Sequence, residues 1–472
     1  MSVNEKMEIG LIVGNRGFFP DHLCQSGRAA MVKLLEEKNI KVIALPENSG
    51  KFGSVETIQD AKKCAELFKK HRETLTGIIV TLPNFGDERA VADTIRWSGL
   101  EVPILVHAWP DDPKKMDVAN RRDSFCGKIS VCNNLNQYGL RFSLTNFHTV
   151  SPESPSFQED LDQFVGVCRV LRGLKNVRLG AVGARPAAFK TVRYSEKILE
   201  QEGISVDTLD LSELLAAAEK LSDTEPEVIN ALKEIQAYSD TSKVTLSSLK
   251  KIARFKLVLD RWVRENDFQA IAVQCWSSLQ ANFGVMPCVA MSMLSQSLIP
   301  AACEVDILGA LSMYILQLAS GQPSALVDWN NNYQAEPDKA VIFHCSNFPV
   351  SYFEKSHLYM SEIIAGTVGQ ENATGTLYGR VKAGPFSFLR LTTSDSTGNI
   401  RGYLGEGKVT ADPVNTFGGY SVVEIEDLQS LLQIICQEGY EHHVAINLSR
   451  CARVIEEALS HYRSWPLYVN LE

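Results

Sequence analysis

The chain has 472 residues, of which 45% are hydrophobic and 22% charged, and its formal net charge is −9 at pH 7. This is an ordinary globular composition, long enough for two to four domains. The acidic balance argues against nucleic acid or an anionic membrane as the main partner. No apolar run reaches the roughly 20 residues that span a bilayer, so we expect no membrane helix.

The first 350 or so residues alternate strand-like apolar runs with amphipathic helical stretches, a pattern that predicts parallel sheets with helices on both faces. In the first part the expected strands are 7–13, 41–45, 77–82 and 102–107, and the expected helices are 28–37, 58–71, 88–98 and 157–171. A second unit follows, with expected strands at 177–182, 203–209, 268–275 and 340–345, a helix-prone region at 211–265 and a helix at 307–318.

After about residue 346 the sequence becomes β-rich and punctuated by glycine, which favours a small antiparallel barrel or sandwich. We expect strands near 375–381 and 386–393, a turn at 401–407, and closing helices near 425–437 and 443–461. The fold class is therefore α/β, with two Rossmann-like doubly wound parallel-sheet domains and a smaller antiparallel β-rich, barrel-like C-terminal domain. The expected domain limits are 1–172, 173–345 and 346–472.

The eleven cysteines are irregularly spaced and form no C-x-x-C pair. The start of the chain lacks the charged-then-apolar build of a signal peptide. Together these features predict a reduced, cytoplasmic protein with buried thiols and no disulfide framework.

Two carboxylates in apolar surroundings are the main candidates for chemistry. Glu304 stands in Cys303-Glu304-Val305-Asp306, and Asp328 in Leu326-Val327-Asp328-Trp329, 24 residues later. Buried carboxylates are costly unless they are paired or bind a metal. A helix cap and a turn are the ordinary alternatives for single acids, and Asp306 fits the start of a helix.

Histidines supply the candidate third ligand. In Glu441-His442-His443-Val444 only one imidazole is expected to enter a given site, and a surface pair at the start of a helix is the alternative. His344 ends an apolar strand, where a core histidine with both nitrogens bonded is an equally good interpretation.

Four further residues are candidate substrate contacts. Arg16 lies in the loop after the first strand, which has neither the G-x-G-x-x-G pattern nor a Walker lysine, so it favours an anionic or polyhydroxyl ligand over a nucleotide. Trp109 follows another strand end, where it would stack on a sugar or simply pack. Gln274 and Trp276 leave a buried strand and suit hydroxyl recognition, with ordinary hydrogen bonding in the core as the alternative.

Taken together, these motifs resemble the L-fucose isomerase / L-arabinose isomerase superfamily, closest to its fucose-isomerase-like branch. The resemblance covers most of the chain and rests on C-E-V-D-I-x-G-A, L-V-D-W, F-H-C-S-N-F-P and E-H-H-V-A in that order. It implies that Glu304, Asp328 and His443 hold a divalent metal, with Mn²⁺ favoured and other divalent ions open, and that His344 lies close to metal or substrate.

The resemblance also implies an aldose–ketose isomerase that works as a homo-oligomer, with a hexamer favoured and active sites between subunits. Arg16 and Trp109 would then reach the site of a neighbouring subunit. Moving a hydrogen between C1 and C2 of an open-chain monosaccharide needs a base and a Lewis acid, and Glu304 and Asp328 would share the proton transfer through a cis-enediol. A metal-assisted hydride shift is the other route.

The sugar stays open at this stage. A deoxy sugar, a pentose and a C6-anionic sugar such as sulfoquinovose are the candidates, and Arg16, Arg185 and Lys190 would supply positive charge to the last. A non-catalytic sugar-binding or regulatory protein on two Rossmann-like lobes is the alternative function. A nucleotide-dependent dehydrogenase is a weaker one, because the glycine fingerprint is missing.

Overall fold

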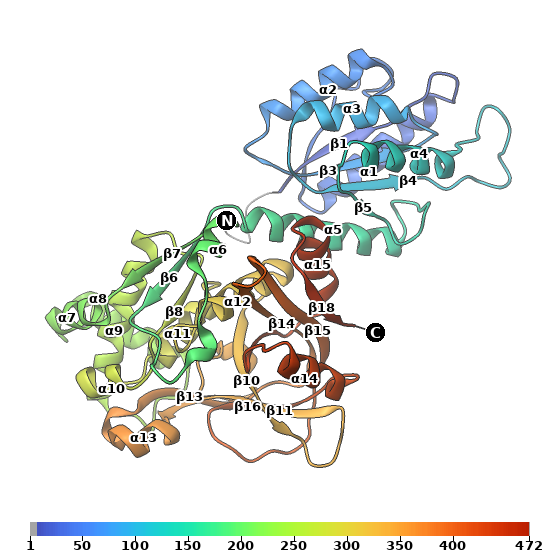
Figure 1. Ribbon diagram of the computed structural model, residues 1–472. Coiled ribbons are helices and arrows are strands. Elements are labelled where there is room, and N and C mark those ends of the chain that lie inside the picture. The colour runs from blue at the N-terminus through green and yellow to red at the C-terminus, as the bar shows by residue number, and fades with distance from the viewer. Residues whose placement is uncertain (1–6, 472) are drawn as a thin grey trace. The chain divides into compact units, whose positions relative to one another are not determined.

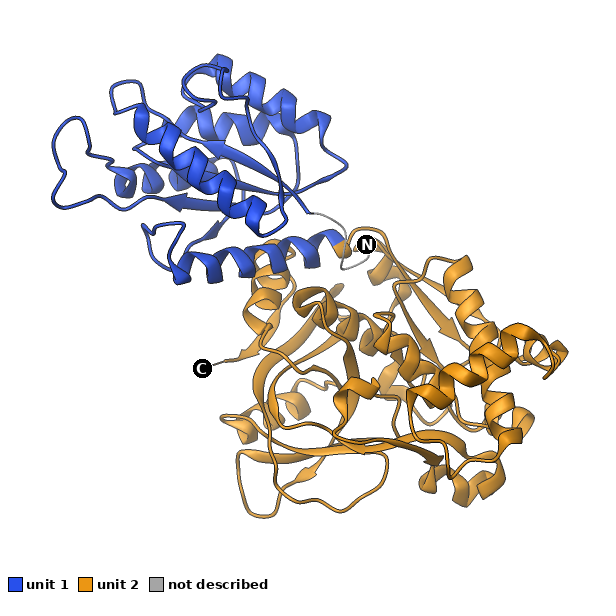
Figure 2. Cartoon of the chain, turned by 180° about the vertical axis from the view of Figure 1, so that it is seen from behind, with its two compact units in different colours: residues 1–172 blue, residues 173–472 orange. Residues whose placement is uncertain are grey.

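The structure is a computed structural model that describes residues 7–471. The chain divides into two compact units, residues 1–172 and 173–472 (Figure 2). Within the described residues, no helix combines the length and the apolar character needed to cross a bilayer.

The first unit, described from residue 7 onward, is a five-stranded parallel sheet in the order β2-β1-β3-β4-β5. Alternate side chains of β1 enter different cores: Leu11 packs with residues of α1 and α5, and Ile12 with residues of α2, α3 and α4. The helices therefore cover both faces of the sheet, as the βαβ alternation predicted. The elements are β1 Glu8–Val13, α1 His22–Glu37, β2 Lys41–Ile43, α2 Ile58–Lys70, β3 Leu75–Leu82, α3 Glu88–Ser98, β4 Ile104–Ala108, α4 Ser124–Gln137, β5 Ser143–Leu144 and α5 Pro155–Gly173.

The second unit begins with a smaller parallel sheet in the order β7-β6-β8-β9. Its elements are β6 Val177–Val182, α6 Glu196–Gln201, β7 Ile204–Leu209, α7 Leu211–Lys220, α8 Pro226–Tyr238, α9 Leu246–Glu265, β8 Ala270–Val273, α10 Ser278–Phe283, α11 Cys288–Gln296, β9 Ala301–Ala302 and α12 Ile307–Ser320. Helix α12 is buried along its length because it packs against β8 of this sheet and against β10, β14 and β17 of the barrel described next (Figure 1).

The rest of the second unit, in the part that the structure describes, is built on a barrel of six antiparallel strands. The order is β16-β11-β10-β17-β14-β15, and β15 pairs back onto β16 to close the ring. These strands are β10 Ser324–Asn332, β11 Lys339–His344, β14 Gly384–Ser394, β15 Asn399–Val409, β16 Gly419–Glu424 and β17 His443–Asn447. Outside the ring lie β12 His357–Met360, β13 Thr374–Arg380, β18 Leu467–Asn470, α13 Glu362–Val368, α14 Leu428–Gln437 and α15 Ala452–Glu456.

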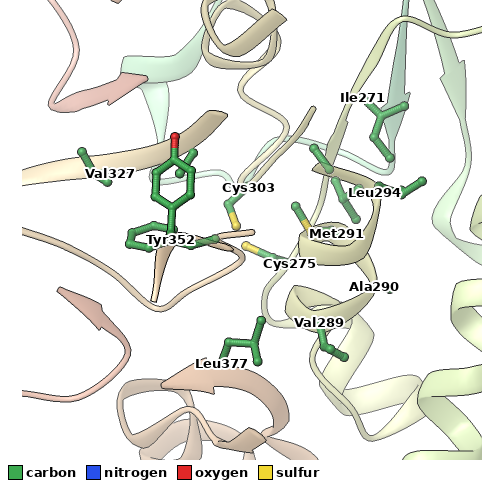
Figure 3. Close-up of a cluster of buried hydrophobic side chains, with 14 of the residues drawn as sticks. Ile271, Cys275, Val289, Ala290, Met291, Leu294, Cys303, Val327, Tyr352 and Leu377 are labelled. Atoms are coloured by element: carbon green, nitrogen blue, oxygen red, sulfur yellow. The ribbon is translucent and has the colours of Figure 1, made fainter. Parts of the chain in front are cut away.

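Parallel α/β sheets followed by an antiparallel barrel confirm the predicted fold class. The expected domain limit at 345/346 stays a prediction: β10 and β11 precede it and share the barrel with later strands. An apolar core joins the parallel sheet and the barrel, with Ile271 of β8 and Val327 of β10 in the same cluster (Figure 3).

Several local predictions are wrong for physical reasons. Residues 443–447 form strand β17 and not the start of a helix, because this segment pairs with β10 and β14 inside the barrel. The glycines of 401–407 lie within β15 and make no turn: a Cβ on Gly402 would come 2.2 Å from the Arg390 carbonyl oxygen. Asp328, which we expected to close an apolar strand, lies inside β10, because this strand continues to Asn332. Helix α4 was not predicted.

Candidate active site

Glu304 stands in the short loop between β9 and α12. Both Glu304 and Val305 have a left-handed backbone, with φ of 54° and 58°. Two consecutive non-glycine residues in this region are strained, and such strain concentrates at functional sites. The side chain is buried, and its Oε1 accepts hydrogen bonds from Trp276 Nε1 at 2.9 Å and Cys275 Sγ at 3.2 Å.

Asp328 and His443 are direct neighbours across the barrel wall, because β10 and β17 pair them in register. Asp328 Oδ1 lies 3.4 Å from His443 Nε2, and Glu304 Oε2 lies 3.6 Å from the same nitrogen. Among residues 7–471, these two carboxylate oxygens are buried and have no hydrogen-bond partner. Two carboxylate oxygens without partners therefore face one imidazole nitrogen.

A buried charge network orients His443 through Nδ1, the ring nitrogen that does not face Glu304 and Asp328. Its Nδ1 lies 2.9 Å from Asp306 Oδ2, and the Asp306 carboxylate also receives two hydrogen bonds from Arg390, at 2.5 and 3.1 Å. Arg390, on β14, is fully buried and donates from Nε to Glu441 Oε2 at 3.1 Å. An Nδ1–H that donates to a carboxylate leaves the lone pair on Nε2, which is the tautomer that a metal ligand requires.

Charge explains the pKa directions in this cluster. Burial would raise the pKa of Asp306, but Arg390 and His443 hold it well below its usual range. Burial would likewise raise the pKa of Glu304, and the nearby His344 and His443 reverse the sign, so that it is lowered. Burial would lower the pKa of His443, but the hydrogen bond to Asp306 and the surrounding carboxylates raise it. Glu304 and Asp306 are thus ionised.

Three further side chains border the site. His344 Nε2 lies 3.7 Å from Glu304 Oε2, and His442 Nε2 lies 3.6 Å from Asp328 Oδ1. Phe189, in the loop after β6, makes ring contacts with Trp276 at 5.6 Å, His442 at 5.3 Å and His443 at 5.8 Å. The site therefore has an aromatic wall where Phe189 and Trp276 meet His442 and His443.

The donor set suits a divalent metal. Within the described residues, ligand atoms of Glu304, His344 and His443 lie within 4.8 Å of one another, and so do those of Asp328, His442 and His443. The two groups share His443. Carboxylate oxygens and a neutral imidazole are ligands that Mn²⁺ and similar ions accept, and a bound cation would satisfy the two orphaned oxygens.

The structure brings together five of the predicted site residues: Glu304, Asp328, His344, His443 and Trp276. Gln274 does not face the acids. Its Oε1 accepts from the Ala184 backbone N–H at 2.9 Å, and it lines a cavity of about 870 Å³ at the carboxyl ends of β6, β7 and β8.

The other two predicted residues belong to the first unit. Arg16 donates from Nε to the Gly86 carbonyl at 3.1 Å and pairs with Glu88. Trp109 donates from Nε1 to Thr81 Oγ1 at 3.0 Å. Both have structural partners in that unit, and their role in binding substrate stays a prediction.

Sequence reasoning missed Arg390, Phe189 and the second role of Asp306. Asp306 does cap α12, since its Oδ1 accepts from the Gly309 N–H at 2.8 Å, but it also orients His443. An arginine in the apolar run Phe386–Leu391 was a signal for Arg390, because an unpaired charge is not tolerated there. Nothing in the sequence marked Phe189.

Comparisons with known proteins agree with this geometry. Residues 10–175 match the family described as "Fucose/sulfoquinovose isomerase, N-terminal domain", and residues 342–470 match "L-fucose isomerase, C-terminal domain". A sulfoquinovose isomerase of Priestia aryabhattai is 26% identical over 349 residues, 73% of this chain and 75% of that protein. A sulfoquinovose isomerase of Alkalicoccus urumqiensis is 24% identical over 314 residues, which cover 65% of this chain and 68% of that protein.

A solved glucose-galactose binding protein from Geobacillus stearothermophilus is also similar, at 15% identity over 68% of this chain and 93% of that one. Its TM-score is 0.16, too low to carry an argument.

The two family matches and the isomerases among the relatives define the class of the protein, which is a sugar isomerase. The chain belongs to the fucose/sulfoquinovose isomerase family. It is an enzyme that interconverts an aldose and a ketose, as the motifs predicted. A non-catalytic binding protein or a dehydrogenase is not supported by these matches.

Proposed function

We propose that the chain is a Mn²⁺-dependent aldose–ketose isomerase whose metal ligands are Glu304, Asp328 and His443. One observation carries the proposal: Glu304 Oε2 and Asp328 Oδ1, both buried and without hydrogen-bond partners within residues 7–471, face His443 Nε2 at 3.6 and 3.4 Å. Leaving two buried carboxylate oxygens without partners is costly unless a cation joins them. When bound, a divalent ion supplies a Lewis acid that polarises a carbonyl group.

The residues of the chain supply the proton chemistry. Glu304 and Asp328 lie on either side of His443, so one carboxylate accepts the proton from the carbon next to the carbonyl and the other returns a proton to the neighbouring carbon of the cis-enediol. Trp276 Nε1, bonded to Glu304 Oε1, holds the plane of that carboxylate. His344, 3.7 Å from Glu304 Oε2, suits a contact with a substrate hydroxyl or with the metal.

The substrate class that we propose is a monosaccharide with an anionic group at C6, such as sulfoquinovose. The named relatives at 24 and 26% identity support this choice over a deoxy sugar. Arg185, Phe189 and Lys190 lie in the segment between β6 and α6, and Phe189 contacts the site. We therefore assign Arg185 and Lys190, the charges of the second unit, to the anionic end. Gln274, which lines the cavity at the carboxyl ends of β6, β7 and β8, remains a proposed substrate contact.

We further propose a homo-oligomer, with a hexamer favoured, in which Arg16 and Trp109 serve a neighbouring subunit. The first unit exposes several large apolar side chains, including Phe18 at 82%, Phe147 at 60% and Ile129 at 54%. Exposed apolar groups of this size commonly mark interfaces. All eleven cysteines lie within the described residues and are free, which supports a reducing, cytoplasmic compartment.

Metal analysis and a substrate panel test the proposal. The purified protein should hold about one Mn²⁺ per chain and convert a C6-sulfonated aldose faster than the matching neutral aldoses. Deuterium from solvent entering at C1 or C2 supports the enediol route, and its absence favours the hydride shift. A protein that binds no divalent metal and converts no aldose refutes the assignment.

A further inference from the structure

Four cysteine thiols form a chain beside Glu304. Cys275 contacts Cys303, Cys303 contacts Cys345, and Cys345 contacts Cys288. Cys275, Cys288 and Cys303 are buried, and Cys345 is only partly buried. Figure 3 shows the sulfurs of Cys275 and Cys303 turned toward one another inside the apolar core.

This thiol chain reaches the other oxygen of the catalytic carboxylate. Cys275 Sγ lies 3.2 Å from Glu304 Oε1, whereas Glu304 Oε2 is the oxygen that faces His443. The Sγ atoms of Cys275 and Cys303 and a carboxylate oxygen of Glu304 all lie within 4.8 Å of one another. One carboxylate thus separates a set of oxygen and nitrogen donors from a set of sulfur donors.

The two donor sets differ in the ions that they prefer. Thiolates select soft and borderline ions such as Zn²⁺ and Cd²⁺, while carboxylates and imidazole also suit Mn²⁺, which binds thiolates poorly. Zn²⁺ is commonly held by a small group of thiolates completed by nitrogen or carboxylate oxygen. Cys345 is the partly exposed member of the thiol chain.

We propose that Cys275 and Cys303, together with Glu304 Oε1, form a second cation site that takes a thiophilic divalent ion such as Zn²⁺ or Cd²⁺. Cys345, in contact with Cys303, is the next thiolate within reach. As the ion binds, each coordinating thiol gives its proton to solvent and forms a metal–sulfur bond, so no redox partner is needed. The site is separate from the Mn²⁺ site but shares Glu304 with it.

Occupancy of this site inhibits the enzyme. A cation drawn to Oε1 competes for the charge of Glu304 and displaces the hydrogen bonds from Trp276 and Cys275 that orient the carboxylate. This consequence rests on the proposed function, because it requires Glu304 to act in catalysis. The binding itself does not, so the two statements fail separately.

Titration of the full-length protein with Cd²⁺ in excess Mn²⁺ tests the binding. We expect a thiolate-to-cadmium charge-transfer absorption that saturates near one ion per chain, with loss of isomerase activity over the same range. Cys303→Ala and Cys275→Ala should remove the absorption and raise the Cd²⁺ concentration for half-inhibition at least about tenfold. Cys436→Ala, which removes an exposed thiol of the same unit, should behave as wild type.

Two results overturn the proposal: wild-type protein with no charge-transfer absorption, or an absorption that survives both buried-site substitutions. If those variants do not fold, anomalous scattering from a wild-type crystal soaked in Cd²⁺ decides the matter. Cadmium between Cys275 and Cys303 supports the site, and cadmium only at His443 and Asp328 refutes it. Binding without inhibition leaves the site in place and refutes the shared role of Glu304.

Discussion

Two buried histidines, one in each unit, show what distinguishes a structural from a functional polar group here. His107 on β4 is fully buried, and both its ring nitrogens have neutral partners: Nδ1 lies 2.9 Å from Thr81 Oγ1 and Nε2 lies 2.7 Å from the Val150 carbonyl. In His443 only Nδ1 has a hydrogen-bond partner among the described residues, and that partner is the charged carboxylate of Asp306. Its Nε2 faces two carboxylate oxygens that have no partner among the described residues.

The pKa directions separate the two histidines further. Burial lowers the pKa of His107 to about 3, so this imidazole is neutral in the fold. Burial acts in the same sense on His443, but Asp306 and the carboxylates of the site raise its pKa. Burial alone therefore does not mark a site. An orphaned atom opposite a ligand atom does.

The largest expected effect is the loss of activity in Glu304→Gln. The amide keeps the shape and the acceptor for Trp276, but it removes a metal ligand and a proton-transfer group. We expect kcat/KM to fall at least about 10³-fold, with bound Mn²⁺ lost. Steady-state kinetics and metal analysis measure this.

Glu426→Gln, at an exposed position of the same unit, is the matched control and should leave both values unchanged. Retention of activity in Glu304→Gln would show that the unpartnered oxygen has no catalytic role.

Asp306→Asn tests the support behind His443. Asparagine still accepts from the Gly309 N–H, but it no longer fixes the tautomer of His443 or neutralises Arg390. Mn²⁺ affinity should fall about 10- to 100-fold, and the free energy of unfolding should fall by about 3–5 kcal/mol because Arg390 loses a buried partner. Metal titration and urea unfolding measure the two effects.

Asp210→Asn makes the same change at the start of α7, where Asp210 accepts from the Ser212 N–H and does not contact the site. It should leave the free energy of unfolding close to that of the wild type and leave metal affinity intact. Equal effects in both variants would mean that Asp306 is only a helix cap.

His107→Asn tests the structural histidine of the pair through the pH dependence of stability. The pKa of His107 is about 3 in the fold and about 6.5 when unfolded. Between these values the unfolded chain binds the extra proton. His107 therefore does not lower the free energy of unfolding above about pH 6.5. Below that pH the free energy of unfolding falls by about 1.4 kcal/mol per pH unit, until the pH reaches the pKa in the fold.

The variant should lose about 1–3 kcal/mol at neutral pH and show a shallower fall in the urea midpoint toward pH 4. His22→Asn, at an exposed position in the same unit, should reproduce the wild-type slope. An unchanged slope in His107→Asn would rule out His107 as the acid-sensitive group.

The fold was largely predictable because its strands carry continuous apolar runs. Helix 88–98 and strand 177–182 match the observed bounds of α3 and β6, and most other elements of the parallel sheets shift by a few residues. The errors cluster in the barrel. There, β17 and β15 are defined by pairing with strands distant in sequence, and the glycines of β15 serve close packing, which no local pattern reveals.

The site was predictable where chemistry and neighbours agreed. Glu304 and Asp328 stood out as acids in apolar runs, and His443 entered through motif resemblance. Arg390 and Phe189 could not be assigned to the site from sequence, because their contacts cross 51 or more residues. These contacts depend on how β14 and the loop after β6 meet β17 and α12.

The smallest expected effect is that of Phe189→Ala. Its ring meets Trp276 and His442 edge to face, at 5.6 and 5.3 Å, so it shields the site without carrying a charge or a proton. An aromatic contact contributes about 0.5–1.5 kcal/mol, so KM should rise up to about tenfold while kcat changes less than about twofold. Tyr359→Ala, which removes a similar edge contact with Tyr378 between β12 and β13, is the control and should change neither constant. A fall in kcat with KM unchanged would instead place Phe189 among the groups that act in the transition state. A packing side chain would then take part in catalysis, and an orphaned polar atom would no longer be what separates functional from structural residues at this site.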